Sequence, residues 1–217
     1  MKNQVRKKEE SLLAEKRGSK LPLYMKNCRW IILLGLLIIS QLGANSVEAI
    51  SNPWPMFSHD PQRSGRCNYI GIKQPSLKWS YFANSYIFAA PVIDHSGRIY
   101  LVTEDGDLHI ISSSGKKEKI VSIGVKIDST PAISEDGNIY IGVSNGHLLC
   151  FNAKGESQWV YPTKSKIKSS PAINQEEIIF IGCENGTLHA INKDGSLKWK
   201  YQASSSIQSS PAINKNG

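Results

Sequence analysis

Residues 168–199 read KSSPAINQEEIIFIGCENGTLHAINKDGSLKW, and this stretch decides the fold. It holds two apolar runs, 178–181 and 188–191, which are joined through Asn185-Gly186. Asn-Gly favours the type I′ turn of a two-residue β-hairpin, because both central residues of that turn need a positive φ. A proline precedes the hairpin, and a segment ending in a tryptophan follows it. The stretch therefore predicts four short strands separated by turns.

The chain repeats this unit with a period of 40 residues. Prolines, turn glycines and apolar residues all keep the same register over at least three units. These positions are Pro91, Pro131, Pro171 and Pro211, Gly106, Gly146 and Gly186, Gly115, Gly155 and Gly195, Ile99, Ile139 and Ile179, and Leu108, Leu148 and Leu188. A fixed period between about 20 and 50 residues indicates a repeat architecture, and four strands in about 40 residues are typical of a propeller blade. We predict an all-β propeller built of four-stranded antiparallel blades.

The charge of the chain does not indicate a nucleic-acid-binding protein. The formal net charge is +8, but residues 1–49 carry nine of the basic and only four of the acidic side chains. Residues 50–217 carry 17 basic and 14 acidic side chains, so the repeats are nearly neutral. No basic stripe of the kind that follows a phosphate backbone is present in the sequence.

The start of the chain has the pattern of an export signal. The apolar run 30–42 is too short for a membrane span of about 20 residues, and Lys26 and Arg29 precede it. Small residues around Ala49 fit a cleavage site, so we interpret 25–49 as a signal peptide and 1–24 as a charged extension. An uncleaved signal anchor is the alternative, since a long basic segment can support one. Membrane contact would then occur through this leader alone.

Residues 50–76 form an irregular lead-in, because three prolines within 53–61 disfavour regular structure. Its apolar residues need cover, so we expect the segment to lie over a propeller face or a blade seam. Its only dense polar cluster consists of His59, Asp60, Arg63 and Arg66. The cluster lacks a nucleophile, and hydrogen bonding that fixes a loop is the favoured interpretation over catalysis.

Three further groups of residues have ordinary structural explanations. Cys67, Cys150 and Cys183 leave an odd count outside the leader, and we interpret the last two as small buried hydrophobes in strands. Trp79, Trp159 and Trp199 share a repeat position on the fourth, outer strand, which Lys119 takes in the second unit, and we expect them to pack between blades. The charged residues of the turns are interpreted as solvated. They are Glu104, Asp105 and Asp107 on one hairpin, and Lys164, Lys166 and Lys168 near another.

Residues 77–217 resemble a known family. The pattern SSPAI, IYIG, GxLxAIN and a final tryptophan is similar to the PQQ-like β-propeller repeat. That repeat occurs in quinoprotein alcohol dehydrogenases and in the propeller subunit of the bacterial outer-membrane β-barrel assembly machine. The resemblance is specific for the fold and weak for function, because the members range from enzymes to scaffolds. Glu176-Glu177 in place of an Asp-Gly turn, and Lys119 in place of tryptophan, depart from the pattern.

The resemblance implies two different functions. Dehydrogenases of the family hold PQQ with a disulfide of adjacent cysteines, a stacking tryptophan, a calcium ion and an aspartate base. This sequence has no adjacent cysteines, and its acidic turns lack the spaced ligands of a calcium loop. We therefore assign no catalytic, cofactor-binding or metal-binding residue and no cofactor. We expect an exported, non-catalytic scaffold that binds protein partners outside the cytoplasm, in the periplasm, the cell envelope or beyond the cell. The alternative is an N-terminal fragment of a PQQ-dependent dehydrogenase.

The repeats of residues 77–217 predict an incomplete ring. They supply one leading outer strand, three blades and the first strand of a fourth unit, SSPAINKNG. Known propellers have roughly four to eight blades, so we expect this sequence to cover part of a propeller with about seven or eight blades. Assembly of several chains into one ring is the alternative.

We predict that export is accompanied by cleavage after Ala49, because a short apolar run and a Val-x-Ala motif precede that bond. N-terminal sequencing of the exported protein should begin at Ile50. Exported protein that still begins upstream of Trp30 would contradict cleavage and support the anchor.

Overall fold

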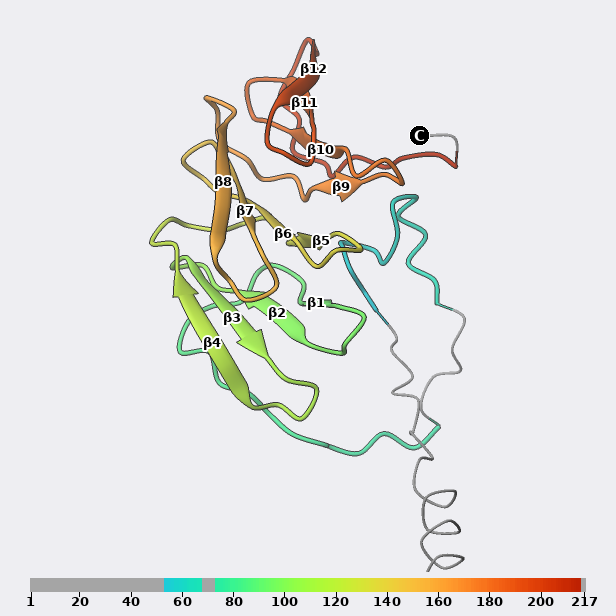
Figure 1. Cartoon of the computed structure of the whole chain (residues 1–217), viewed down its shortest axis with the longest axis vertical. Coiled ribbons are helices and arrows are strands. Elements are labelled where there is room, and N and C mark those ends of the chain that lie inside the picture. Colours follow the sequence, from blue (N-terminus) through green and yellow to red (C-terminus); the bar gives the residue numbers. More distant parts are fainter. Residues whose placement is uncertain (1–52, 68–72, 216–217) are drawn as a thin grey trace, which may run out of the picture. The chain divides into compact units, whose positions relative to one another are not determined.

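The computed structural model describes residues 53–67 and 73–215 (Figure 1). All of them belong to the second of two units of the chain, Ala49–Gly217. The predicted extension 1–24 and signal peptide 25–49 lie outside the described residues. No helix among the described residues is long and apolar enough to cross a membrane.

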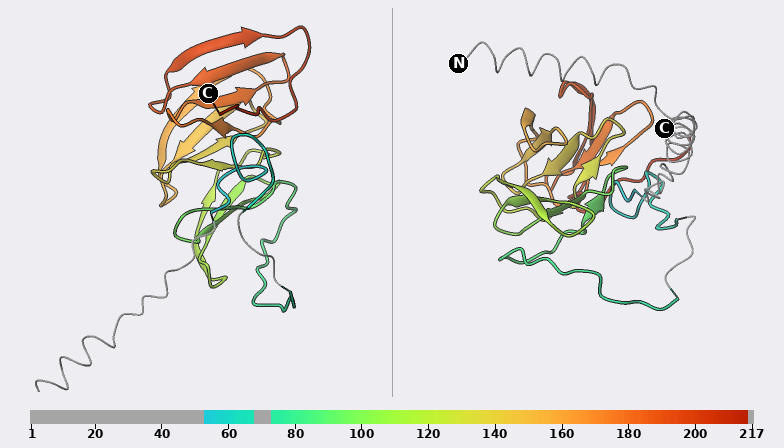
Figure 2. Two further views of the ribbon diagram at one scale, coloured as in Figure 1. Left: turned by 90° about the vertical axis from the view of Figure 1, so that its right-hand side faces the viewer. Right: turned by 60° about the horizontal axis from the view of Figure 1, so that its bottom comes forward.

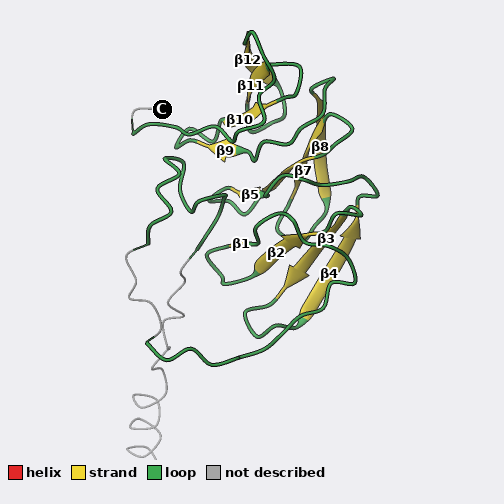
Figure 3. Cartoon of the chain, turned by 180° about the vertical axis from the view of Figure 1, so that it is seen from behind, coloured by secondary structure: helices red, strands yellow, loops and turns green. Residues whose placement is uncertain are grey.

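Twelve strands form three sheets, and no helix occurs among the described residues (Figures 1 and 3). Each sheet has four antiparallel strands that follow one another in chain order. The strands of the first blade are β1 (Val92–Ile93), β2 (Ile99–Val102), β3 (Asp107–Ile111) and β4 (Lys117–Ser122), those of the second are β5 (Ala132–Ile133), β6 (Ile139–Gly142), β7 (His147–Phe151) and β8 (Ser157–Pro162), and those of the third are β9 (Ala172–Ile173), β10 (Ile179–Gly182), β11 (Thr187–Ile191) and β12 (Leu197–Gln202). The predicted all-β fold with four-stranded blades is confirmed.

The hairpin at Asn185-Gly186 differs from the predicted type I′ turn. Only Gly186 has a positive φ, at 81°, whereas type I′ requires a positive φ at Asn185 as well. The N–H of Gly186 donates to the oxygen of Cys183 at 3.0 Å, and the N–H of Cys183 donates to the oxygen of Thr187 at 3.0 Å. This is the longer hairpin loop in which a left-handed glycine follows a tight turn. The prediction that Gly186 is a turn residue is confirmed, and the prediction of a two-residue loop is wrong.

The sheets are buried against one another, because both of their faces are apolar. One core cluster joins Val102 and Leu108 of the first blade to Ile139 and Ile141 of the second. A second cluster joins Leu148 of the second blade to the third blade and includes Met56 of the lead-in. Figure 2 shows the three sheets lying side by side. The two apolar faces of the second blade are therefore explained by a neighbouring blade on each side.

A line of hydrogen bonds joins the inner strands from one repeat to the next. The backbone N–H of Ala90 donates to Oγ1 of Thr130 at 3.1 Å, and the N–H of Thr130 donates to Oγ of Ser170 at 3.0 Å. The N–H of Ser170 donates in turn to Oγ of Ser210 at 2.9 Å. Each of these hydroxyls thus accepts a hydrogen bond from the backbone of the repeat before it.

Ser129 and Ser169, each one residue before a hydroxyl of this line, form hydrogen bonds within their own blades. Oγ of Ser129 donates to the oxygen of Gly142 at 2.8 Å, and Oγ of Ser169 donates to the oxygen of Gly182 at 2.9 Å. These glycines end β6 and β10. A Cβ at Gly182 would lie 2.3 Å from Cγ2 of Ile207, so only glycine fits there without movement of its neighbour.

Trp159 and Trp79 pack across the outer part of the seams, as predicted, whereas Trp199 does not pack between described blades. The indole of Trp159 on β8 lies on Gly195 of the next blade, where an added Cβ would come within 2.8 Å of the ring. Its Nε1 donates to the oxygen of Lys193 at 2.9 Å. Trp79 lies on Gly115 in the same way.

Lys119 takes the tryptophan position at the seam between the first and second blades. Its Nζ donates to the oxygen of Lys154 at 2.8 Å, so a cation replaces the indole N–H as the donor to the neighbouring turn. On the outer strand of the third blade, Trp199 is 42% exposed and packs beside Phe180 of its own sheet.

The lead-in lies along the innermost strands (Figure 1, blue-green). The N–H and oxygen of Trp54 both bond to Ile93 of β1 at 2.9 Å. The N–H of Ile133 on β5 donates to the oxygen of Pro55 at 2.7 Å, and the N–H of Ile213 donates to the oxygen of Pro61 at 2.8 Å. The segment thus bonds to the first, the second and the fourth repeat. This agrees with the expectation that it covers part of the propeller.

We predict that Ser170→Ala lowers the free energy of unfolding by about 1–3 kcal/mol, because the buried N–H of Thr130 loses its acceptor. Ser170→Thr should cost less, because it keeps the hydroxyl and the second repeat has threonine at this position. Urea unfolding followed by circular dichroism measures both. Equal losses for the two variants would show that the hydroxyl does not contribute.

Candidate functional site

The seams between neighbouring blades bring side chains of different repeats together. At one seam, Oη of Tyr161 lies 3.1 Å from Nδ1 of His189 on β11. Ahead of the first blade, Oη of Tyr81 lies 2.8 Å from Nδ1 of His109 on β3. Both ring pairs meet edge to face, with centroids 5.6 and 5.7 Å apart. In each pair the tyrosine and the histidine are 28 residues apart in sequence. These residues were not singled out from the sequence, although this repeated spacing of tyrosine and histidine is visible in it.

The two imidazoles of these pairs are held in their neutral form. His109 and His189 are buried, and neither Nε2 atom has a hydrogen-bond partner. Burial lowers the pKa of both rings, because the charged form loses hydration. Lys200 lowers the pKa of His189 further, whereas the carboxylates of Asp107 and Asp105 partly oppose the shift at His109.

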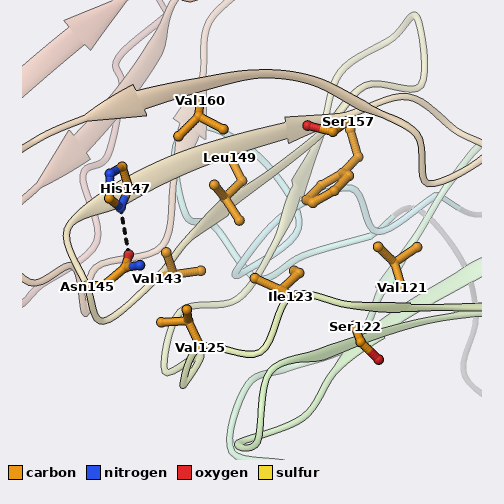
Figure 4. A pocket seen from close by; sticks show the side chains of 11 residues that line it. Val121, Ser122, Ile123, Val125, Val143, Asn145, His147, Leu149, Ser157 and Val160 are labelled. Carbon is orange, nitrogen blue, oxygen red and sulfur yellow. Dashed lines mark hydrogen bonds between the residues drawn. The ribbon is translucent and has the colours of Figure 1, made fainter.

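The seam between the first and second blades lacks a tyrosine–histidine pair. Val121 and Leu149 stand at the equivalent positions, and a cavity of about 340 Å³ opens between β4, β7 and β8 (Figure 4). At its edge, Nδ1 of His147 lies 2.8 Å from Oδ1 of Asn145. The cavity walls are mostly aliphatic.

The predicted polar cluster of the lead-in fixes its own loop. Asp60 accepts hydrogen bonds from the N–H of Ser64 at 3.0 Å and from the Ser64 hydroxyl, and Nδ1 of His59 lies 3.5 Å from it. Burial alone would raise the pKa of Asp60, but these neighbours lower it below its ordinary value. The N–H of Arg66 donates to Oγ of Ser64 at 3.3 Å. These contacts hold the turn and agree with the favoured interpretation.

Arg63 has a different role from the rest of that cluster. Its Nε donates to the oxygen of Pro211 at 2.9 Å, and Nη2 donates to the oxygens of Pro171 at 3.1 Å and Ser170 at 3.2 Å. Burial lowers the pKa of Arg63 to about 10, which leaves it charged at neutral pH. The side chain therefore links the lead-in to the inner ends of the third and fourth repeats.

The other predicted residues form no reactive group. Cys150 and Cys183 are buried, as predicted, but only Cys150 lies in a strand, since β10 ends one residue before Cys183. Burial raises the pKa of both thiols, that of Cys150 to about 12. Glu104 pairs with Lys126 at 2.6 Å, and Lys168 pairs with Glu184 at 2.7 Å. Asp105 and Lys164 are exposed, as expected, whereas Glu104 and Lys168 are partly buried and form ion pairs.

The described residues do not fit a quinone cofactor of the kind that the resemblance implies for dehydrogenases. The cysteines Cys150 and Cys183 are unpaired and lie in different blades. Within residues 53–67 and 73–215, no group of three His, Cys, Asp or Glu side chains could hold a metal ion. A second cavity, of about 350 Å³, lies between the lead-in and the inner turns and is lined by Glu135, Glu176 and Lys215 among others.

Residues 106–216, just over half of the chain, match the family model described as outer membrane protein assembly factor BamB. The chain belongs to this family of PQQ-like repeat propellers. A comparison with curated proteins finds no match.

The solved structures similar to this BamB-family chain include propellers of two kinds. BamB from Moraxella catarrhalis is 22% identical with a TM-score of 0.53, over 58% of this chain and 40% of that protein. The quinohemoprotein alcohol dehydrogenase of Comamonas testosteroni is 21% identical with a TM-score of 0.61, over 71% of this chain and 28% of that enzyme. A second such dehydrogenase, from Pseudomonas putida, is 16% identical with a TM-score of 0.55, over 72% and 27%. The chain thus spans less than half the length of these proteins, and the likeness shows the fold.

We predict that acidification from about pH 7 to 5 destabilises the blades through the two buried histidines. Their pKa values are lowered in the folded state, so the unfolded chain takes up protons first as the pH falls below the ordinary histidine value of 6.5. The contribution of the two histidines to the free energy of unfolding is therefore complete above pH 6.5 and is lost as the pH falls below it. The double variant Y161V/H189L, which copies the Val121–Leu149 seam, should lose less stability over this range. An unchanged pH dependence of its unfolding free energy would contradict the prediction.

Proposed function

We propose that this chain is part of an exported, non-catalytic β-propeller that binds other proteins. The observation that carries the proposal is the position of the lead-in. Backbone groups of Trp54, Pro55 and Pro61, with the guanidinium of Arg63, occupy hydrogen-bonding positions along the inner strands. The inner part of the described structure is thus occupied by structural contacts, whereas the outer strands and turns face solvent.

Two further features support protein binding. The matching family is named for an outer membrane protein assembly factor, and a BamB structure is among the similar folds. The described surface also carries exposed aromatic residues between the lead-in and the first blade. Phe82, Tyr86 and Phe88 are all more than half exposed, and the last two rings stack at 6.0 Å. Exposed aromatic side chains are typical anchors of protein interfaces.

We also propose that the chain acts outside the cytoplasm. The sequence pattern of residues 25–49 supports this location. The proposed compartment is the periplasm or the cell envelope, where a protein-binding propeller would meet other exported proteins.

A dehydrogenase fragment is the second candidate function, because two of the similar structures are quinohemoprotein alcohol dehydrogenases. The described cysteines and acidic residues do not supply the cofactor ligands that those enzymes would need. A cofactor in such a protein would require residues other than those described here.

We predict that a photo-crosslinking amino acid in place of Phe88, introduced in the native host, gives discrete adducts with other exported proteins. The same amino acid in place of Gln158, exposed on the outer strand β8, serves as the matched control. An exported, folded protein that gives no adduct at Phe88 would count against the interaction role.

We further expect no stoichiometric binding when the protein is dialysed against PQQ and calcium, with the quinone absorbance as the measurement. A bound quinone at one equivalent would favour the dehydrogenase instead.

A further inference from the structure

The seam between the first and second blades departs from the repeat at several adjacent positions. Lys119 replaces a tryptophan, Val121 replaces a tyrosine, and Leu149 replaces a histidine. The chain segment that crosses from one blade to the next is altered in the same way. Its alternate residues are Val121, Ile123 and Val125. The other three crossings have a tyrosine, then an alanine or threonine, then a serine at these positions: Tyr81, Ala83 and Ser85; Tyr161, Thr163 and Ser165; and Tyr201, Ala203 and Ser205. All of these changes meet at one place.

Four of the altered residues, Val121, Ile123, Val125 and Leu149, line the cavity of about 340 Å³, and Lys119 lies outside it (Figure 4). Val121, Ile123 and Val125 form one wall, and Leu149 with Val160 form the opposite one. This volume is near the lower end of the roughly 300–1,000 Å³ of small-molecule pockets. The walls are apolar, and hydroxyl, amide and imidazole groups lie at the edge.

The seam is anchored on both sides of the cavity, which keeps it from closing. Toward the centre, the N–H of Ala90 donates to Oγ1 of Thr130 at 3.1 Å. Toward the outside, Nζ of Lys119 donates to the oxygen of Lys154 at 2.8 Å. The spacing of the two blades is therefore set by contacts outside the cavity, and shortening two side chains leaves space between them.

We propose that this cavity binds a single aromatic ring of the phenol type. The other seams show what the same backbone frame accepts, because a tyrosine ring meets a histidine there. At this seam, His147 lies two residues before Leu149 on β7, on the same side of the strand. His147 also lines the cavity, and its Nδ1 lies 2.8 Å from Oδ1 of Asn145, so an imidazole and an amide lie at the edge where the phenol hydroxyl would be placed.

The ring can come from a free phenolic molecule or from a tyrosine side chain of a partner. Both present the same chemistry to the cavity: a flat apolar ring with one hydroxyl. The inference concerns the cavity alone, so its outcome does not depend on the scaffold role proposed above.

The test uses p-cresol, the side-chain analogue of tyrosine, titrated into isotope-labelled protein and followed by NMR. We expect roughly millimolar affinity, as for a ligand of eight non-hydrogen atoms, with nuclear Overhauser contacts to the methyl groups of Val121 and Leu149. A tyrosine-containing peptide forms the second arm. Tighter binding of the peptide identifies a partner side chain as the source, and tighter binding of p-cresol identifies a free molecule.

Two double variants provide matched controls taken from the chain itself. V121Y/L149H installs the pair found at the other seams and should weaken p-cresol binding at least about tenfold by filling the cavity. Y161V/H189L opens the equivalent space at the next seam, but Thr187 stands there in place of His147, so a second site there should bind p-cresol more weakly than the first. Circular dichroism melts establish that each variant is folded.

Three results would overturn the proposal. They are no shift of the Val121 and Leu149 signals at concentrations up to about ten millimolar, undiminished binding by folded V121Y/L149H, and ring contacts that lie elsewhere on the protein.

Discussion

The structure depends on one constraint: every four-stranded sheet in it has two apolar faces, so no blade can be buried alone. Leu108 of the first blade and Ile141 of the second share one core, and Leu148 and Ile181 share the next. The inner hydrogen bonds follow from this arrangement. Because each blade must lie against its neighbour at a fixed spacing, the N–H of Thr130 always meets the hydroxyl of Ser170, one repeat further on. Association of blades and their internal folding are therefore coupled.

This constraint separates positions that preserve the fold from positions that are able to vary. The glycine turns and the inner hydroxyls set the spacing of the blades. Side chains in the middle of a seam have more freedom, as the Tyr161–His189 pair and the Val121–Leu149 pair show within one chain. A repeat protein can thus acquire a distinct site by changing one seam while the others keep the frame.

Much of the fold could be predicted from the sequence because the repeats display it several times. The apolar runs 178–181 and 188–191 of the third unit lie on β10 and β11, and each run begins and ends within one residue of its strand. Glycine at 186 was recognised as a turn residue from its chemistry alone. The type of turn was not, because Asn-Gly permits more than one loop and the pairing of β10 with β11 selects the longer one.

The sequence by itself determined the period, the all-β fold and the burial of Cys150 and Cys183, because each follows from local patterns of apolar, glycine and proline residues. Only the tertiary structure decided which residues meet across a seam. The partner of Tyr161 is 28 residues away, and the guanidinium of Arg63 reaches oxygens more than 100 residues away. Such contacts depend on how blades stack, and stacking is set by the summed packing of whole sheets, which no short stretch of sequence encodes.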